Sequence, residues 1–458
     1  MAIRRLLIAN RGEIATRIIR TCRQLGIETV LAASEADRQS LPARLADRTV
    51  CIGPARAADS YLKVGTIVQA AVGVGADAIH PGYGFLSERA ALARLCEEHG
   101  VIFVGPTAAQ LEAVGDKLRA RGEAELADVP LAPGGPVASA EDALRMAGHI
   151  GVPLLVKAVG GGGGRGMKRV DRLDELPAAI ALAAAEAGAA FGDARVYLER
   201  YVTRGRHVEV QVLGDGEGRV VHLGERDCSV QRRYQKLVEE SPAPELSDRL
   251  RHRLHEAAVR FAARLAYRGA GTVEFLVDAE RGAFYFLEMN ARIQVEHPVT
   301  EAVTGIDLVA QQIAIAGGDG LRLEQADIRR QGCAMECRVN AEDPRRDFQP
   351  SPGRVSDVAW PSGPGIRVDT HIEPGSSVPP HYDSLLAKIV AHTPDRAATL
   401  ALLRHALATT RVVGVATNLD FHATVLADRE FETGGVDTGF VARLLARRAA
   451  AAEASPHG

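Results

Sequence analysis

The sequence predicts a multidomain protein of α/β and α+β class. An N-terminal doubly wound parallel sheet, a compact lid, an antiparallel core and a C-terminal β-rich subregion are expected. Three observations predict this class: apolar runs alternate with amphipathic stretches over the first hundred residues, five consecutive glycines interrupt the stretch 154–170, and period-two alternation begins near residue 203. Alternating strand and helix patterns favour a parallel sheet, whereas period-two segments joined by short turns favour antiparallel hairpins.

The composition is that of an ordinary globular protein. The chain has 458 residues, of which 46% are hydrophobic and 25% charged, with a formal net charge of −3. This balance predicts no nucleic-acid partner, and no stretch approaches the roughly 20 apolar residues that span a bilayer. The N-terminal apolar run is too short for a signal peptide, so we expect a cytoplasmic protein without a membrane partner. The six cysteines lack paired C-x-x-C spacing, which predicts reduced, mostly buried thiols.

Residues 1–115 are expected to form the parallel-sheet domain. Its strands alternate with helical stretches, beginning with "RRLLIAN" and "GEIATRIIRTCRQLG". The stretch "HPGYGFLSE" (80–88) follows a strand-like run, and ligands of such sheets bind at the carboxyl ends of the strands. The first turn, "IANRGEI", has one glycine where a dinucleotide fingerprint needs three, so no nicotinamide site is expected.

Residues 116–202 are expected to form a linker and a lid. The stretch "DVPLAPGGPVASAED" predicts a linker without strands, and "LDELPAAIALAAAEAGAAFG" predicts a helix packed on a small sheet. Between them the glycine run indicates a hairpin tip whose N–H groups can contact phosphates, with Lys157 and Arg165 supplying charge. A flexible linker is the alternative. Lys117, in "AVGDKLRAR", is either a phosphate contact or an exposed helix residue.

Residues 203–330 are expected to form an antiparallel core with a metal site. A hairpin in "GTVEFLVDAERGAFYFLEMNAR", turning near Arg281 and Gly282, places Glu274 opposite Glu288, with Asn290 on the same face. Two carboxylates and an amide oxygen suit Mg²⁺. A solvated hairpin face with incidental charges is the alternative, but the apolar flanking residues favour the metal.

Polar side chains are dense beside this hairpin. In "NARIQVEHPVTE" a guanidinium, Arg292, is suited to hold a small anion and a carboxylate, Glu296, to act as a base; an Arg–Glu ion pair that supports a loop is equally open. The stretch "ERDCSVQRRYQKLVEE" (225–240) forms either a basic wall for a triphosphate or a solvated face. Beyond it, residues 331–447 are expected to form a C-terminal domain and residues 448–458 a frayed tail.

These motifs, in this order, resemble the biotin carboxylase family, the ATP-grasp component of biotin-dependent carboxylases. The resemblance covers about residues 2–445 and rests on "IANRGEIA", "HPGYGFLSE", "GDK", "KAVGGGGGRGM", "RHVEVQVLGDG", "ERDCSVQRR", "VEFLVD" and "FLEMNARIQVEHPVTE". It implies that residues 116–202 contain the ATP-grasp lid, that 203–330 are the ATP-grasp core, and that the glycine loop closes over the ATP phosphates.

The resemblance also implies a reaction. ATP and bicarbonate give carboxyphosphate, and the carboxyl group passes to N1′ of a biotin carried on a partner protein. Mg²⁺ or Mn²⁺, as two ions, is the implied cofactor. The implied catalytic residues are Glu296 as the base, Arg292 as the anion anchor, Lys236, and Arg338, which stabilises the biotin enolate.

The remaining site residues follow from the same resemblance. The metal ligands are Glu274, Glu288 and Asn290, and biotin lies near Tyr83 and Arg338. The bicarbonate pocket is formed by Lys236, Arg292, Gln294, Val295 and Glu296. ATP is bound by Lys117, Lys157, Gly162, Gly163, Gly164, Arg165, Gly166, Met167, Glu199, Val202, His207, Gln231 and Leu276.

Departures from the family pattern concern the nucleotide and the lid. Tyr234 stands where His is common, Val159 replaces Ser or Ala, and the segment 133–151 is short. The implied partners are a biotin carboxyl carrier protein, carboxyltransferase subunits and a second copy of the chain, within acetyl-CoA carboxylase; propionyl-CoA, pyruvate or urea carboxylation is the alternative. Another ATP-grasp ligase that forms an acyl phosphate, and a non-catalytic nucleotide-binding scaffold, are the competing interpretations.

Overall fold

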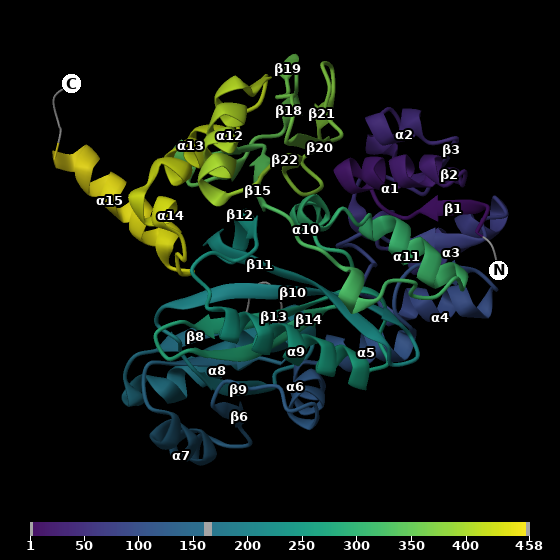
Figure 1. The fold of residues 1–458 in the computed structure, drawn as a ribbon. Helices are drawn as coiled ribbons and strands as arrows, with labels where there is room; N and C mark the ends of the chain where they lie inside the picture. Colours follow the sequence, from purple (N-terminus) through teal and green to yellow (C-terminus); the bar gives the residue numbers. More distant parts are fainter. Residues whose placement is uncertain (1–2, 160–166, 455–458) are drawn as a thin grey trace.

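A central antiparallel sheet organises the fold. The computed structural model describes residues 3–159 and 167–454, so the glycine-loop residues Gly162, Gly163, Gly164, Arg165 and Gly166 lie outside the described residues. Around the sheet lie an N-terminal part in purple, a lid in blue at the bottom of the view, and a C-terminal part in green and yellow (Figure 1).

The N-terminal part is the predicted parallel sheet. Its strands lie in the order β3-β2-β1-β4-β5, and each described pairing is parallel. The strands are β1 (Arg5–Ile8), β2 (Glu28–Ala33), β3 (Arg48–Cys51), β4 (Ala78–His80) and β5 (Ile102–Phe103), and the helices are α1 (Gly12–Gln24), α2 (Leu41–Leu45), α3 (Val64–Gly73), α4 (Ala90–Glu98) and α5 (Ala108–Gly115). The order reverses between β1 and β4. Their carboxyl ends are joined there by Asn10, whose amide donates to Tyr83 O at 2.7 Å.

The lid is a small antiparallel sheet covered by helices. Its strands are β6 (Gly134–Pro136), β7 (Leu154–Ala158), β8 (Met167–Val170) and β9 (Val196–Arg200), in the order β6-β9-β7-β8. Helices α7 (Ala140–Ile150) and α8 (Leu176–Phe191) accompany them, and α6 (Lys117–Leu126) precedes them. The prediction of a linker without strands was wrong at β6. Gly134 has φ +150°, and a Cβ there would lie 2.0 Å from Leu198 O, so glycine permits the close pairing with β9.

The central sheet runs through both the expected core and the expected C-terminal domain. Its order is β14-β13-β10-β11-β12-β15-β22-β20. The strands are β10 (Gly205–Asp215), β11 (Val220–Arg232), β12 (Gln235–Ser241), β13 (Arg268–Asp278), β14 (Ala283–Asn290), β15 (Cys333–Asn340), β20 (Ile366–Thr370) and β22 (Leu385–Thr393). β12 pairs with β15, which covers an edge that would otherwise be open. The two expected domains therefore share one sheet.

Helices and short ribbons complete the C-terminal half. The helices are α9 (Asp248–Arg264), α10 (His297–Thr304), α11 (Leu308–Gly317), α12 (Arg396–Thr409), α13 (Leu419–Ala427), α14 (Arg429–Thr433) and α15 (Phe440–Ala454). The short strands are β16 (Glu342–Asp343), β17 (Gln349–Pro350), β18 (Gly353–Arg354), β19 (Asp357–Ala359), β21 (Ser377–Val378) and β23 (Arg411–Val413). The tail expected to fray from residue 448 continues as helix to Ala454, because alanine is the strongest helix former.

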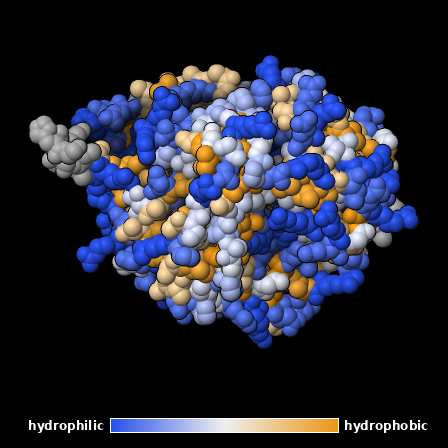
Figure 2. Space-filling view, turned by 90° about the horizontal axis from the view of Figure 1, so that it is seen from above, coloured by the Kyte–Doolittle hydropathy of each residue, from blue (hydrophilic) through white to orange (hydrophobic). Residues whose placement is uncertain are grey.

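The face shown in Figure 2 is mostly hydrophilic, with hydrophobic side chains scattered among charged ones. Among the helices of the described residues, none is long and apolar enough to cross a membrane. The six cysteines are free thiols; Cys22, Cys96, Cys228 and Cys337 are buried, as expected, and only Cys51 is exposed.

Candidate active site

The β13–β14 hairpin places two carboxylates face to face. Glu274 pairs directly with Glu288, as predicted. The strands turn between Asp278 and Ala283. Phe275 pairs with Phe286, but the next pair is Glu274 with Glu288, so Leu287 is left unpaired in a β-bulge. Without this bulge Glu274 would lie opposite Leu287. Asn290 follows Glu288 by two residues and therefore shares its face of the sheet.

Only one of these two carboxylates is neutralised by the protein. Glu274 Oε1 lies 3.1 Å from Lys236 Nζ, and Glu274 Oε2 lies 3.1 Å from His207 Nε2. Burial raises the pKa of Glu274, but these two cations outweigh it and hold the pKa well below its usual range. Within the described residues Glu288 makes no hydrogen bond or ion pair, and burial and the charge of Glu274 raise its pKa. A divalent cation, which prefers oxygen ligands, would compensate the charge that the protein leaves on Glu288.

Asn290 is the third candidate metal ligand. It is buried, its Oδ1 accepts from Arg292 Nη2 at 2.7 Å, and its Nδ2 has no partner in the described residues. Two further groups of side chains also have the spacing of metal ligands: His207, Glu209 and Glu274, and Glu209, Cys228 and Glu296. The Lys236 ammonium contacts carboxylates of both groups and also Glu274. Glu288 differs from all of these because it has no hydrogen bond or ion pair within the described residues, so its carboxylate is the one that most needs an added cation.

Lys236, on β12, is the charge centre of the site. Its Nζ donates to Glu209 Oε2 and to Glu296 Oε1, both at 2.6 Å, and to Glu274 Oε1 at 3.1 Å. Burial lowers the pKa of Lys236, but the surrounding acidic groups outweigh it and raise the pKa well above its usual value. The ammonium is therefore permanently charged, as an anion-binding group requires.

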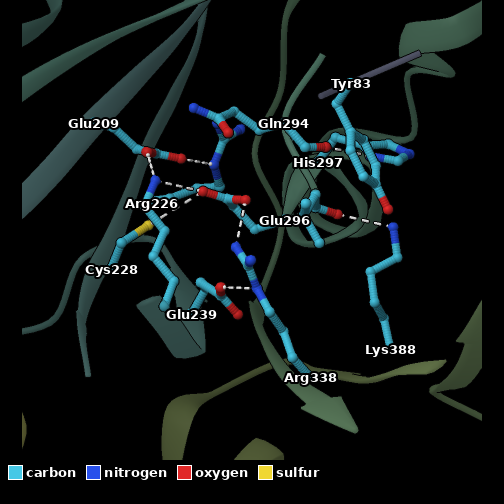
Figure 3. Close-up of polar contacts among 12 residues, drawn as sticks. Tyr83, Glu209, Arg226, Cys228, Glu239, Gln294, Glu296, His297, Arg338 and Lys388 are labelled. Carbon is cyan, nitrogen blue, oxygen red and sulfur yellow. Dashed lines mark hydrogen bonds and ion pairs between the residues drawn. The ribbon is translucent and has the colours of Figure 1, made fainter. Parts of the chain in front are cut away.

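Glu296 lies just before α10 and is completely buried (Figure 3). Besides Lys236, its carboxylate accepts from Arg338 Nη2 at 2.8 Å, while Arg338 Nε donates to Glu239 at 2.6 Å. Burial raises the pKa of Glu296, yet Lys236 and Arg338 hold it well below its usual range. The carboxylate is thus ionised, the form that a general base has before it accepts a proton.

Arg292 and Gln294 connect this centre to the metal candidates. Arg292 Nε lies 3.0 Å from Glu88 Oε2, and its Nη1 donates to Gln294 Oε1 at 2.9 Å. Gln294 Nε2 in turn donates to Glu274 at 3.2 Å. Arg292 does not pair with Glu296, so the two polar groups of this segment are not a mutual loop-supporting ion pair. The structure brings together the four side chains predicted for the bicarbonate pocket, those of Lys236, Arg292, Gln294 and Glu296. Val295 is predicted to contribute its backbone, and its carbonyl oxygen accepts from Lys388 at 2.8 Å.

The predicted nucleotide residues lie on the lid and the neighbouring strands. Lys157 and Arg121 both form ion pairs with the buried carboxylate of Glu199. Because both cations already bind that carboxylate, it is not free to contact adenine. An adenine contact from this region would come from the residues after β9, where Val202 lies. Burial lowers the pKa of Lys117, which is half-buried at the start of α6 rather than exposed.

The other predicted nucleotide residues fall on paired strands. Met167 pairs with Lys157 across β7 and β8, and His207 pairs with Leu276 across β10 and β13. The Gln231 side chain is buried and donates to Cys228 O at 3.3 Å.

Tyr83, one of the two biotin candidates, and the two substituted residues, Tyr234 and Val159, lie in different settings. The hydroxyl of Tyr83 donates to Glu13. Tyr234 is 57% exposed at the tip of the β11–β12 turn, where it and Arg233 both have positive φ. Val159 is buried at the end of the first described segment.

Sequence reasoning missed the acidic partners of the site. Glu209 binds Lys236 and Arg226, Glu239 binds Arg338, and Glu13 binds Tyr83. A single charged residue within an apolar alternating strand, as in "HVEVQV" for Glu209, was the available signal. The side chain of such a residue either faces solvent or is buried next to an opposite charge. The order of the strands in the sheet decides which, and the sequence does not give that order.

Comparisons with known proteins show the family of the chain. Residues 2–111 match the family model "Biotin carboxylase, N-terminal domain", residues 116–324 the model "Carbamoyl-phosphate synthase L chain, ATP binding domain", and residues 336–443 the model "Biotin carboxylase C-terminal domain". The biotin carboxylase of Nostoc sp. is 49% identical over 443 residues, which cover 96% of this chain and 99% of that protein.

Solved structures show the same fold. The biotin carboxylase domain dimer of the 2-oxoglutarate carboxylase of Hydrogenobacter thermophilus, in complex with MgADP, ADP and bicarbonate, superposes with a TM-score of 0.93 at 44% identity, covering 97% of this chain and 98% of that one. A pyruvate carboxylase of Rhizobium etli superposes with a TM-score of 0.91 at 43% identity, covering 96% of this chain and 40% of that one.

The fold and the matched ATP-binding domain define an enzyme of the ATP-dependent ligase class. Three family models match consecutive parts of the chain, two of them models of biotin carboxylase domains. The chain belongs to the biotin carboxylase family.

Proposed function

We propose that this enzyme uses ATP and bicarbonate to carboxylate the biotin group of a carrier protein, through a carboxyphosphate intermediate. The observation that carries the proposal is the meeting of Lys236, Glu296 and Arg338. The buried carboxylate of Glu296 contacts two cations there, and the facing carboxylates of Glu274 and Glu288, which suit a metal, lie beside it. This arrangement combines a base, an anion site and a cation site within one buried cluster.

Bicarbonate binds, in this proposal, among Lys236, Arg292, Gln294, the Val295 backbone and Glu296. Glu296 accepts the bicarbonate proton, and a bicarbonate oxygen attacks the γ-phosphorus of ATP as the bond to ADP breaks. This step brings negative charges together, so fixed cations at the reacting oxygens lower its barrier. Lys236 and Arg292 supply that charge without reorganising.

The nucleotide lies between the lid and the central sheet. Lys117 and Lys157 contact its phosphates, the region around Glu199 and Val202 holds adenine, and His207, Gln231, Leu276 and Met167 line the pocket. Glu274, Glu288 and Asn290 would hold Mg²⁺ or Mn²⁺, as two ions, which neutralises the phosphate oxygens when bound. The glycine loop that we expect to cover the phosphates lies outside the described residues.

Biotin binds near Tyr83 and Arg338. The C–O bond of carboxyphosphate breaks and phosphate leaves; this phosphate takes the N1′ proton, and N1′ bonds to the carboxyl carbon. Loss of the proton places negative charge on the ureido oxygen, and a guanidinium is suited to stabilise it. When Glu296 has taken a proton, its attraction for Arg338 weakens. Arg338 then remains anchored through Glu239, with Nη2 available for the biotin enolate.

The wider assignment is also a proposal. We infer that the carrier is a biotin carboxyl carrier protein, that carboxyltransferase subunits complete the complex in the cytoplasm, and that this chain forms a homodimer. Acetyl-CoA carboxylase, and with it fatty-acid synthesis, is the assembly we favour. The final acceptor does not enter this site, so the site itself does not distinguish acetyl-CoA carboxylation from propionyl-CoA, pyruvate or urea carboxylation. The biotinylated protein that co-purifies with the chain tests the choice, because each assembly has its own carrier.

Steady-state ATP hydrolysis tests the proposed half-reaction. The purified chain with Mg²⁺ should hydrolyse ATP only when bicarbonate is present, and free biotin should stimulate the rate. ATP turnover that is indifferent to both compounds would instead support another ATP-grasp ligase. Nucleotide binding without any turnover would support the scaffold interpretation.

A further inference from the structure

Two cations, a buried lysine and a half-buried arginine, face each other on neighbouring strands behind the site. Lys388 on β22 pairs directly with Arg338 on β15. Like charges at this spacing repel, so each needs its own anions. Arg338 is offset by Glu239 and Glu296, whereas Lys388 Nζ lies 3.1 Å from Glu13 Oε2 and 4.0 Å from Asp369 Oδ2. In Figure 3 both side chains extend from the same side of the view toward the segment of Glu296 and His297.

These neighbouring cations hold consecutive residues of one segment. Arg338 binds the Glu296 side chain at 2.8 Å, and Lys388 Nζ donates to Val295 O, also at 2.8 Å. A paired set of strands therefore fixes both the proposed base and the backbone that precedes it. Displacing the Val295 carbonyl would shift the backbone of the bicarbonate pocket.

Lys388 also reaches the N-terminal part of the molecule. Glu13, in the first turn of α1, lies 3.1 Å from the ammonium and accepts the hydrogen bond of the Tyr83 hydroxyl. The Lys388 ammonium, on β22, thus contacts both α1 and the segment before α10. Through Glu13 it is also linked to Tyr83, which follows β4. The Tyr83 ring is half-buried, so a ligand can contact it.

The burial of Lys388 is costly. Its side chain has no exposed surface, and lysine is almost never fully buried unless it is paired. An aliphatic side chain of similar volume would avoid the desolvation of the ammonium. It would, however, leave the Glu13 carboxylate and the Val295 carbonyl without this partner. The backbone of the bicarbonate pocket and the Glu13 side chain that accepts from Tyr83 would then be less firmly held.

We propose that Lys388 is a positioning residue that sets the bicarbonate pocket and the Tyr83 side of the biotin site together. It does so through Val295 O on one side and Glu13 on the other. The inference rests on the proposed function, because it assumes that bicarbonate and biotin bind at these two places. Lys388 contacts neither reactant and acts through other residues.

Steady-state kinetics of K388M test this role. A hydrogen bond to a charged group changes an equilibrium constant about tenfold. K388M should therefore raise the KM for bicarbonate and the KM for free biotin by about this factor, and leave the KM for ATP unchanged. The exposed lysine at the start of α3 supplies the matched control: K63M should change none of the three values. A residue with a purely structural role would lower the melting temperature or the active fraction without this selective pattern.

A second pair of variants keeps the inference testable if K388M does not fold. E13Q keeps an oxygen acceptor for Tyr83 but removes the anion beside Lys388, and should raise the same two KM values. In E13Q/Y83F the KM for biotin should not exceed that of the weaker-binding single variant, E13Q or Y83F, because both changes act on one pathway.

The two levels of proposal fail differently. A wild-type chain whose ATP turnover ignores bicarbonate would contradict the proposed function. A bicarbonate-dependent wild type, with unchanged KM values for bicarbonate and biotin in E13Q and in any folded K388M, would overturn only the role of Lys388.

Discussion

Glu288 faces Glu274 across the β13–β14 hairpin, yet Lys236 and His207 contact only Glu274. The uncompensated carboxylate is the reason to expect a metal ion there. E288Q should raise the Mg²⁺ concentration for half-maximal activity about tenfold or more. The metal-free variant should melt at the same or a higher temperature than the wild type, because the repulsion between the carboxylates is removed. A lower melting temperature with unchanged Mg²⁺ dependence would contradict the metal assignment.

Glu296 is expected to be essential for turnover but not for nucleotide binding. E296Q should lower kcat at least about 100-fold, the usual contribution of a general base, and change the ATP dissociation constant by less than about threefold. Loss of the charge leaves Lys236 and Arg338 less well compensated, so the variant should also be less stable by about 1–3 kcal/mol. Calorimetric titration with ATP and a thermal melt of the same sample separate these effects. Activity equal to that of the wild type would reopen the scaffold interpretation.

His422 should make the protein less stable as the pH falls. Burial lowers its pKa from 6.5 to about 4, and its Nε2 lies 2.7 Å from Arg338 O. Because the unfolded state binds the proton and the folded state does not, stability declines as the pH drops from 6.5 to about 4.

H422Q can keep the hydrogen bond to Arg338 O but cannot titrate. The pH dependence of its unfolding free energy over this range should therefore be smaller, by up to about 1.4 kcal/mol per pH unit. Urea unfolding at several pH values measures the slope. An unchanged slope would show that His422 does not titrate differently in the two states.

Tyr234 is expected to have little influence on catalysis. Tyr234 is 57% exposed at a turn, whereas the residues assigned to the reaction are buried or half-buried wherever the structure describes them. Y234H, which restores the common family residue, should leave kcat within about twofold, because an exposed substitution changes little free energy. A larger change in kcat, rather than in the KM for ATP, would show that this turn contributes to the chemistry.

The sequence predicted local pairings better than distant ones. Glu274 could be placed opposite Glu288 because both lie on one hairpin, although the bulge at Leu287 that makes this pairing possible was not visible. Glu209 was missed because it faces Glu274 only through the pairing of β10 with β13, which are far apart in the chain. Lys388 was missed for the same reason: nothing in an apolar strand reveals that its ammonium lies near Glu13 and Val295.

The expected division at residue 331 shows the same limit. Composition changes there, but hydrogen bonds between β12 and β15 continue the sheet across it. The pairing brings Glu239 and Arg338 close enough for their ion pair, at 2.6 Å. A boundary drawn from composition separates stretches of chain, whereas the site depends on which strand edges meet.

The most direct test of the account follows an oxygen atom from bicarbonate. If bicarbonate attacks the γ-phosphorus of ATP and the carboxyl group later leaves the phosphate, one bicarbonate oxygen remains on the released phosphate. With ¹⁸O-labelled bicarbonate, ATP, Mg²⁺ and biotin, mass spectrometry of the product should find one labelled oxygen in each phosphate released. Phosphate that carries oxygen from water alone would contradict carboxyphosphate formation in this site.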